Sequence, residues 1–186
     1  MKITEPVETP RLILRDMRES DVEDYVRWFT TETEWGDWDA PWEGHFDGTA
    51  EEERESWTEC FEAVKGLPAD AFRRKFEIEL DGRHVGWICS YTDLGYLENP
   101  EGIPAIGLDI PDPADRGRGC GLLAFRLYTD YLRGRGHRSF FTQTWSGNLR
   151  MTRLAEKLGF REVCRRKGFR EVRGKRYDAV TYRLDV

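Results

Sequence analysis

The sequence predicts a single domain of the mixed α/β class. Three observations predict this class. Short apolar runs typical of strands alternate with segments of helical periodicity. An Asp-Gly pair joins two of these runs as a hairpin turn, and a glycine-rich loop stands between a strand and a helix. The chain has 186 residues, 39% of them apolar, and is long enough to bury a substantial core.

The first third of the chain predicts one strand and two helices. Leu-Ile-Leu at 12–14 is typical of a short buried strand. Ser20 and Glu23 have the spacing of a capping box. Apolar residues recur at i, i+3, i+4 and i+7 over 22–29, which predicts an amphipathic helix. A stretch of interleaved glycines and tryptophans follows, and 51–64 predicts a second, acidic helix.

The middle of the chain predicts three strands. Residues 74–80 and 85–91 are joined by Asp81-Gly82, a pair that favours the two-residue turn of a hairpin. A looser section leads to a third apolar run at 105–110, directly before the glycine-rich loop.

The last third predicts a helix, a strand, a second helix and two closing strands. The first helix covers 122–133, and the strand that follows covers 140–145. Asn148 is a favourable N-cap for the helix 149–158, and Gly159 has the position of a glycine that ends it. The closing strands are expected at 160–167 and 176–184.

Composition narrows the class of protein. The start has no apolar core of a signal peptide, and no segment approaches the roughly 20 apolar residues of a membrane span. The four cysteines are scattered, which favours a reducing cytoplasm over a disulfide scaffold or a zinc site. The three histidines are far from one another in the sequence, which also argues against a metal site. The expectation is therefore a cytoplasmic protein with no metal and no membrane partner.

The net charge of −6 conceals an asymmetry along the chain. Residues 21–62 carry 15 acidic and two basic side chains, whereas 133–176 carry 14 basic and three acidic ones. Such a chain can present one surface to an anion and another to a cation. The alternative is that the two regions face solvent and partly neutralise each other. Nucleic-acid binding through the basic region is disfavoured by the overall acidity, so no nucleic-acid partner is expected.

The loop at 116–121, Arg-Gly-Arg-Gly-Cys-Gly, is the strongest local signal. Its glycines allow the backbone to turn and to approach a ligand closely. The helix that follows directs its free N–H groups at the loop, which predicts a phosphate site. A dinucleotide site would need an acidic residue at the end of the next strand, where Gln143-Thr144-Trp145 stand instead. A Walker loop is excluded because no Gly-Lys-Ser/Thr follows.

The loop and its surroundings resemble the GNAT superfamily of acetyl-CoA-dependent N-acetyltransferases, whose pyrophosphate loop has the pattern Gln/Arg-x-x-Gly-x-Gly/Ala. Arg116, Gly119 and Gly121 match this pattern, and the order of elements up to Leu158-Gly159-Phe160 strengthens the likeness over about residues 103–162. The opening at 9–15 resembles the first strand of the branch that acetylates the N-termini of ribosomal proteins. The resemblance implies a mixed, mostly antiparallel sheet of about seven strands flanked by helices.

The resemblance also implies residue roles around acetyl-CoA as co-substrate. Backbone N–H groups of the loop would hold the pyrophosphate, and two arginines would add charge. Leu108 and Ile110 would lie on a strand that diverges from its neighbour and faces the pantetheine arm. Asn148 would bond the pantetheine amides, and Arg153, with Arg150 or Lys157, would reach the adenosine phosphates; a solvated helix face is the alternative for these three. The loop residues are Arg116, Gly117, Arg118, Gly119, Cys120 and Gly121.

The usual catalytic positions of the family are apolar in this chain. Many relatives have a glutamate that acts as base where this chain has Ala105, and a tyrosine that acts as acid where it has Ala155. Some relatives have a serine where it has Met151. Asp109, beside the expected thioester, is the leading candidate base, with a backbone-bonded carboxylate at a strand end as the alternative. A backbone N–H near Asp109 would polarise the thioester carbonyl. Weaker candidates for the acid are Tyr91, Tyr128 and Ser146.

The acceptor is expected to be a small-molecule or peptide amine. The tract 35–43 combines indoles with carboxylates, which suits a cation, and Trp35, Asp37 and Trp38 are its candidate binding residues. A loop pinned by buried tryptophans is the alternative. At pH 7 an α-amine is about 10–15% neutral but a lysine only about 0.04%, so a weak base favours an α-amine or another amine of low pKa.

Direct attack on the thioester is expected, since no cysteine stands where a covalent carrier would be obvious. Two further points stay open. A CoA-binding protein without transferase activity is the alternative function, and a homodimer is compatible with the sequence.

Overall fold

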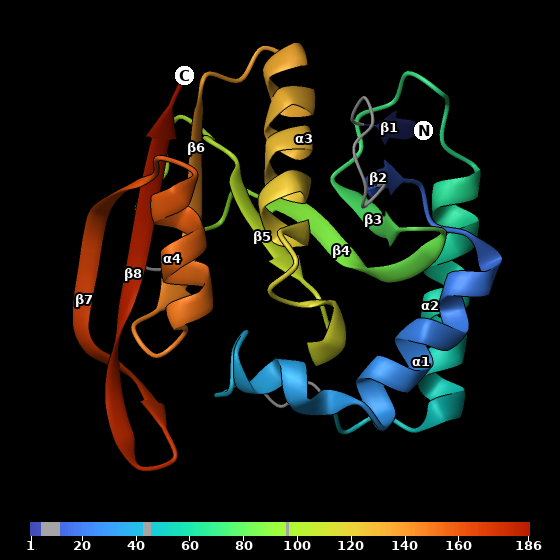
Figure 1. The fold of residues 1–186 in the computed structure, drawn as a ribbon, viewed down its shortest axis with the longest axis horizontal. Helices are drawn as coiled ribbons and strands as arrows, with labels where there is room; N and C mark the ends of the chain where they lie inside the picture. The colour runs from blue at the N-terminus through green and yellow to red at the C-terminus, as the bar shows by residue number, and fades with distance from the viewer. Residues whose placement is uncertain (5–11, 43–45, 96) are drawn as a thin grey trace.

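The computed structural model describes residues 1–4, 12–42, 46–95 and 97–186. Two expected features fall partly outside these ranges: residues 9–11 of the opening strand, and Glu43 of the tryptophan-rich tract. The described chain contains eight strands and four α-helices (Figure 1). The strands are β1 (Lys2–Thr4), β2 (Leu12–Arg15), β3 (Lys75–Leu80), β4 (Arg83–Tyr91), β5 (Ala105–Asp109), β6 (Ser139–Trp145), β7 (Arg161–Val172) and β8 (Lys175–Asp185); the helices are α1 (Val22–Thr30), α2 (Ala50–Lys65), α3 (Cys120–Gly134) and α4 (Leu149–Lys157).

The strands form one sheet in the order β1-β2-β3-β4-β5-β6-β8-β7. Every described pairing is antiparallel except that of β5 with β6, which is parallel. The expected mixed, mostly antiparallel α/β fold is confirmed. The strand that the sequence did not predict is β1, which has three residues and lies at the edge of the sheet.

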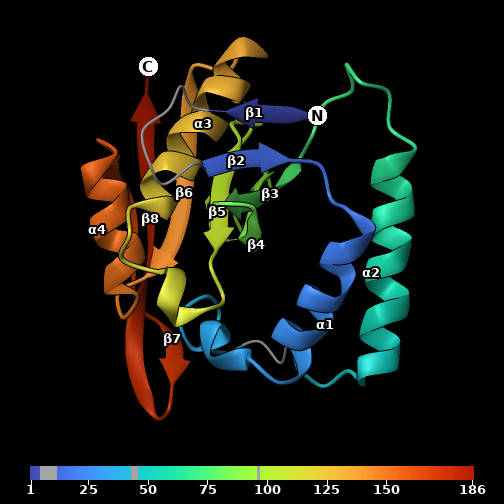
Figure 2. The ribbon, with the colours of Figure 1, turned by 45° about the vertical axis from the view of Figure 1, so that its right-hand side comes forward.

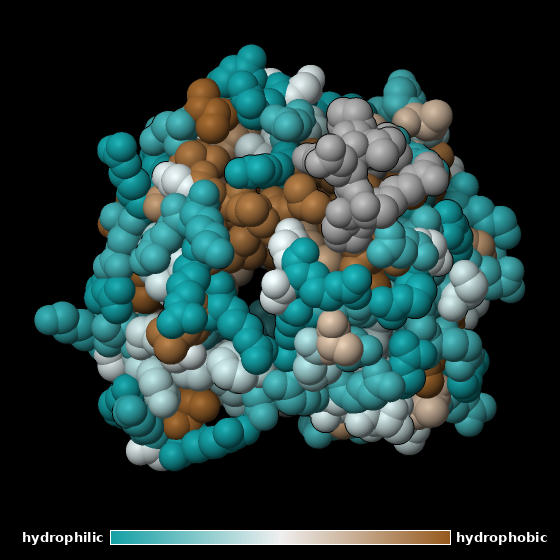
Figure 3. Space-filling model, in the orientation of Figure 1, coloured by the Kyte–Doolittle hydropathy of each residue, from teal (hydrophilic) through white to brown (hydrophobic). Residues whose placement is uncertain are grey.

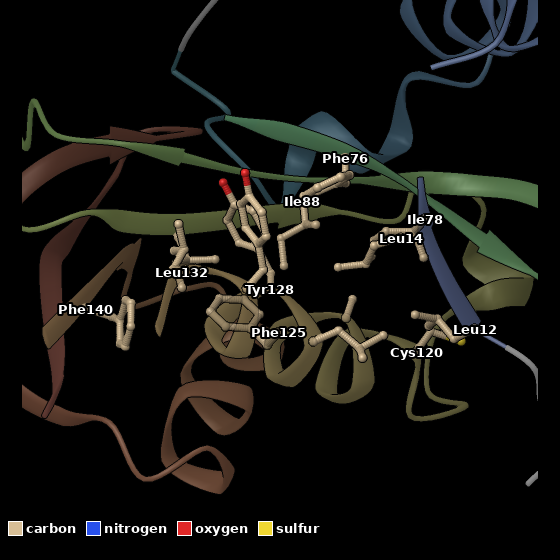
Figure 4. Packing of buried hydrophobic residues seen from close by; sticks show 14 of the residues in the cluster. Leu12, Leu14, Phe76, Ile78, Ile88, Cys120, Phe125, Tyr128, Leu132 and Phe140 are labelled. Carbon is tan, nitrogen blue, oxygen red and sulfur yellow. The ribbon is translucent and has the colours of Figure 1, made fainter. Parts of the chain in front are cut away.

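Helices cover both faces of the sheet. Helices α3 and α4 lie on one face, and α1 and α2 lie on the other (Figure 2). On the α3 face, Phe76 and Ile78 of β3 pack with Phe125 and Tyr128 of α3 in the main apolar core (Figure 4). Leu14 of β2 joins them, and all five side chains are fully buried. This core fixes α3, and with it the loop at the start of α3, against the sheet.

Side chains alternate between the two faces of a strand. Glu77 and Glu79 therefore point to the face of β3 opposite to that of Phe76 and Ile78. Glu77 accepts a hydrogen bond from the Tyr25 hydroxyl at 2.5 Å, and Glu79 accepts one from Arg15 Nε at 2.7 Å. Both glutamates are buried beneath α1. Helices α1 and α2 therefore rest on aromatic rings and paired charges, whereas α3 rests on an apolar core.

The local signals in the sequence have different outcomes. Asp81 and Gly82 adopt φ values of 49° and 81°, so the predicted two-residue hairpin turn between β3 and β4 is confirmed. The capping box predicted at Ser20 and Glu23 is wrong. Residues 19–21 form a 3-10 helix instead, and the N-cap of α1 is Asp21, whose carboxylate is bound by Arg15 at 2.6 and 2.8 Å. Asp21 thus joins this turn to β2 through an ion pair and also accepts a local hydrogen bond from the Arg18 N–H at 2.7 Å.

The predicted ends of α4 are confirmed. The side-chain oxygen of Asn148 accepts a hydrogen bond from the Met151 N–H at 3.0 Å, and Gly159, with φ 86°, follows the last turn. Because Asn148 caps α4 in this way, the helix begins beside the end of β6. Among the described helices, none is both long and apolar enough to cross a membrane.

Candidate functional site

A cleft opens where β5 and β6 diverge. The two parallel strands are in register at Ala105 and Phe141, and the Thr142 hydroxyl donates to the Ile106 carbonyl at 2.8 Å. Beyond this point, residues 107–109 of β5 and 142–144 of β6 line a cleft of about 460 Å³. Figure 3 shows a hollow near the centre of this face, between α4 and the loop that precedes α3. Leu108 and Ile110, both singled out from the sequence, line the cleft.

The glycine-rich loop forms one wall of the cleft. Gly117 and Gly119 have φ values of 76° and 84°, and a Cβ added at either would meet nothing within 4 Å. Both glycines line the cleft, and the first free N–H groups of α3 follow directly after them. Gly121 is different, because a Cβ there would come within 3.3 Å of Leu154 on α4. Cys120 also lines the cleft and is buried.

The structure places the two loop arginines differently, and Arg116 is the one that lines the cleft. Arg116 Nε donates to the Ile110 carbonyl at 2.7 Å, its Nη2 donates to the Pro111 carbonyl, and its Nη1 binds Glu34 at 2.6 Å. Its guanidinium is thus committed to the end of β5. Arg118 lies outside the cleft lining and approaches Asp115 at 3.6 Å.

Asn148 lines the cleft, and its side-chain amide already has two partners in the chain. Its oxygen caps α4, and its Nδ2 donates to the Trp38 carbonyl at 2.7 Å. Its amide is therefore used to hold the tryptophan-rich tract, and a pantetheine amide would have to replace one of these bonds. Arg150, Arg153 and Lys157 of α4 all line the cleft and supply its positive charge.

Asp109 is the last residue of β5 and faces the cleft opposite Asp39. On β4, Gly86 allows the backbones to come close, since a Cβ there would lie 2.0 Å from the Asp109 carbonyl oxygen. Burial raises the pKa of Asp109 well above its usual range, and the charge of Asp39 raises it further, while Lys75 and Arg116 act in the opposite direction. Among the described residues, none hydrogen-bonds its carboxyl group.

The three weaker candidates for a catalytic acid do not line the cleft. The Tyr128 hydroxyl lies in the main core, 2.8 Å from both Ser90 Oγ and the Arg74 carbonyl, and burial raises its pKa. Ser146 Oγ accepts a hydrogen bond from the Asp178 N–H at 3.0 Å. Tyr91 packs with the separate apolar cluster around Leu94. The structure therefore brings none of them to Asp109.

The tryptophan-rich tract reaches the cleft, but through a different carboxylate from the one expected. Trp35 and Trp38 line the cleft, as does Asp39. Asp37, the candidate chosen from the sequence, lies outside the lining and pairs with Arg173 at 2.7 Å. The tract forms a short 3-10 helix over Thr33–Asp37, and this tight turn directs neighbouring side chains to different sides.

The sequence did not single out two carboxylates that matter here. Asp39 belongs to the tract and lines the cleft. Glu34 lies outside the lining and binds Arg116 and Trp38, which do line it. The only sequence signal for these residues is the alternation of indoles and carboxylates in this region. That pattern does not indicate which carboxylate lines the cleft.

Comparison with known proteins adds to this geometry. Residues 11–161 match the sequence model of the family described as "Acetyltransferase (GNAT) domain". None of the curated proteins matched the sequence.

Solved structures share the fold along nearly the whole chain. The chain is similar to RimL, described as a ribosomal L7/L12 alpha-N-protein acetyltransferase in complex with coenzyme A, with 18% identity, a TM-score of 0.72 and 98% of each chain covered. It is also similar to RimJ of Mycobacterium smegmatis in complex with CoA-disulfide, with 19% identity and a TM-score of 0.75 over 100% of this chain and 88% of that one. A GNAT-family acetyltransferase of Bacillus anthracis has 18% identity and a TM-score of 0.71 over 100% and 98%.

Proposed function

This chain belongs to the GNAT acetyltransferase family, and we propose that it transfers the acetyl group directly to a primary amine held between Asp109 and the tryptophan-rich tract. The family makes it an N-acetyltransferase with acetyl-CoA as co-substrate. The observation that carries the proposal is Asp109. Its carboxyl group lies in the cleft at the end of the diverging strand, and no described residue hydrogen-bonds it.

The residues present fit acetyl-CoA. Gly117 and Gly119 leave the backbone of the loop open, and the N-terminus of α3 follows, which suits a pyrophosphate. Arg150, Arg153 and Lys157 would neutralise its phosphates, and the edge of β5 at Leu108 and Ile110 would pair with the pantetheine arm. When bound, acetyl-CoA supplies an activated acyl carbon, so that a C–N bond forms as the C–S bond breaks. Coenzyme A would leave as a thiolate that takes a proton from solvent.

Asp109 would accept the proton that the attacking amine loses. A carboxyl group whose pKa is raised is a better match to this task near neutral pH than an ordinary aspartate. A backbone N–H at the end of β5 would polarise the acyl carbonyl. Two cysteines lie on this part of the fold, and burial raises the pKa of Cys89 to about 11 and raises that of Cys120 as well. Thiols that stay protonated do not favour a covalent carrier, which supports direct attack.

We infer that the acceptor is an α-amine of a peptide or a small cationic amine. Trp35 and Trp38 place two indoles in the lining of the cleft and Asp39 places a carboxylate there, a combination that attracts a cation. An α-amine has a larger neutral fraction at pH 7 than a lysine. One similar structure is described as an enzyme that modifies the N-terminal serine of ribosomal protein L7/L12, which agrees with an acceptor of this class.

A thiol-release assay across N-terminal peptides, polyamines and aminoglycosides tests the proposal. Release is expected with at least one α-amine or low-pKa amine. Asp39→Asn is expected to raise the KM for that amine about tenfold by removing a charge-assisted contact, with unchanged affinity for CoA. Asp37→Asn is the matched control, because Asp37 pairs with Arg173 outside the cleft. CoA binding without turnover on any amine would contradict the proposal.

A further inference from the structure

Glu34 connects two parts of the cleft that are far apart in the sequence. Its Oε2 accepts a hydrogen bond from Arg116 Nη1 at 2.6 Å, and its Oε1 accepts one from the indole N–H of Trp38 at 2.6 Å. Arg116 is itself bound to the carbonyl groups of Ile110 and Pro111. Glu34 therefore joins the end of the strand that carries Asp109 to the tract that carries Trp38.

Trp38 is also held from the other side of the cleft. Its carbonyl oxygen accepts hydrogen bonds from Asn148 Nδ2 at 2.7 Å and from Trp145 Nε1 at 2.9 Å. The guanidinium of Arg150 lies 4.1 Å from the centroid of its ring. The tract thus bridges the gap between the ends of β5 and β6. We name the group Glu34, Trp38, Arg116 and Asn148 the clasp.

The charges around Glu34 stabilise the hydrogen bonds of the clasp. Burial tends to raise the pKa of Glu34, but hydrogen bonds from Trp38 and Arg116 and the charges of Arg116 and Arg150 lower it below its usual value. The carboxylate is therefore ionised at neutral pH. The Glu34 side chain is 49% exposed and that of Arg116 only 13%. An isolated exposed pair contributes little, but one carboxylate that binds a guanidinium and an indole together orients both.

We propose that Glu34 is a positioning residue for the amine acceptor, which through the clasp holds Trp38, and with it Asp39, at the end of the cleft where Asp109 lies. This inference rests on the proposed function, since it takes the tract to be the acceptor side. Arg116 is then a structural member of the clasp. All three of its side-chain nitrogens already donate to described groups.

The proposal separates effects on the acceptor from effects on the cofactor. Loss of the Glu34 carboxylate removes the partner of the Trp38 indole N–H and of Arg116 Nη1, which loosens Trp38. The other two bonds of Arg116 and the backbone of residues 117–121 are expected to stay in place. In Glu34→Ala the KM for the amine is expected to rise about five- to twentyfold. The effect is moderate because solvent screens the half-exposed carboxylate of Glu34. The kcat should fall less, and the affinity for CoA should change by less than about twofold.

The test compares Glu34→Ala, Trp38→Phe and the double variant. Steady-state kinetics would use a serine-initiated hexapeptide and spermidine as acceptors, and calorimetry would measure CoA affinity. Trp38→Phe removes the indole N–H but keeps an aromatic ring beside Arg150. Because both substitutions break the same bond, the double variant should raise the KM no more than the larger single one. Glu34→Gln, which keeps an accepting oxygen, should recover part of the loss.

Glu32→Ala is the matched control, because Glu32 lies beside the same tract and pairs with Arg27 at 3.0 Å. Hydrogen exchange gives a readout that needs no activity. The Trp38 and Asp39 amides donate to the Trp35 carbonyl at 2.9 and 3.2 Å. Their exchange should be faster in Glu34→Ala and unchanged in Glu32→Ala.

Unchanged acceptor KM and unchanged exchange in Glu34→Ala would overturn the proposal. So would a loss of CoA affinity as large as the rise in acceptor KM, since Glu34 would then belong to the cofactor site. If the wild-type chain releases no thiol with either acceptor, the proposed function fails for these amines. Hydrogen exchange then decides by itself whether Glu34 holds the tract.

Discussion

The two sides of the cleft are built in different ways. The proposed cofactor side comes from one stretch of the chain, which runs from β5 through the loop 116–121, the start of α3 and the end of β6 to α4. The acceptor side is a short tract whose contacts reach partners 82 to 110 residues away. The cofactor side also rests on an apolar core, whereas the acceptor side rests on aromatic rings and buried charges.

This difference indicates how amino-acid substitutions should affect each side of the cleft. A loop formed by neighbouring residues keeps its shape through local backbone preferences, so its chemistry stays the same when distant residues change. A tract held by distant partners changes when any of them changes. We expect substitutions on the acceptor side to alter which amine is used, and those on the cofactor side to alter CoA binding.

The largest effect is expected at Asp109, where the two sides meet. Asp109→Asn should lower kcat about 10²- to 10⁴-fold, the usual contribution of a general base, with little change in CoA affinity. A base works unprotonated, so the wild-type rate should rise with pH through the raised pKa of Asp109, and this limb should vanish in the variant. Stopped assays between pH 5.5 and 9 would measure both.

Asp109→Asn should not destabilise the fold. A folded-state pKa above the unfolded value means that ionised Asp109 opposes folding at higher pH. The melting temperature of Asp109→Asn should therefore equal or exceed that of the wild type at pH 8. A lower melting temperature would assign Asp109 a structural role instead.

The next effect separates the cofactor side from the acceptor side. Gly119→Ala places a Cβ at φ 84°, on the open side of the loop. It should weaken CoA binding about tenfold or more and cost about 1–2 kcal/mol of folding free energy, since L-residues disfavour this conformation. Calorimetry and urea unfolding measure the two effects. Gly134→Ala is the control, because nothing lies near its Cβ position and its φ is not positive.

Asn148 contacts both sides of the cleft, and two substitutions can separate its capping of α4 from its bond to Trp38. Asn148→Ala should cost about 0.5–2 kcal/mol of folding free energy through the lost cap of α4 and should also release Trp38. Asn148→Asp keeps the capping oxygen but loses the Nδ2 donor to the Trp38 carbonyl. It should keep the melting temperature near that of the wild type while raising the acceptor KM. Equal destabilisation by both variants would show that the cap is not the main contribution.

The smallest effect concerns the buried charges beneath α1. His84 is bonded to Asp24 and Glu77 at 3.0 Å each. Burial alone would lower its pKa, but these two bonds raise it above the usual value. Such a group stabilises fully below its unfolded pKa of about 6.5 and loses this contribution as pH rises through the folded pKa.

His84→Gln should therefore cost more stability at pH 6 than at pH 8. The difference should be about 1 kcal/mol at most, since the neutral ring keeps a hydrogen bond. Thermal melts across this range measure it. A cost that does not change with pH would mean that His84 contributes through packing alone.

Several features of the fold could be predicted because they depend on neighbouring residues. The Asp81-Gly82 turn, the Asn148 cap and the glycine after α4 all follow from side chains within a few positions of one another. The capping box at Ser20 was wrong because Asp21, not Ser20, is the N-cap of α1, and its carboxylate binds Arg15 of β2 as well as the Arg18 N–H. A long-range ion pair leaves no periodic trace in the sequence.

The candidate site divides in the same way. The glycine pattern was sufficient to place the loop beside a cleft, but not to show that Arg116, which lines the cleft, is also bound to Glu34. Between Asp37 and Asp39, two positions apart, the sequence offered no basis for a choice. Arg173 on the β7–β8 hairpin pairs with Asp37, while Asp39 lines the cleft.

By itself the sequence determined the fold class, the glycine-rich loop and the family, because glycine spacing, helix caps and strand alternation act within a few residues. Only the tertiary structure decided which carboxylates face the cleft and which arginines are available to a ligand. Those outcomes depend on partners brought together from distant parts of the chain, and the free energy of such contacts exists only once the sheet has formed.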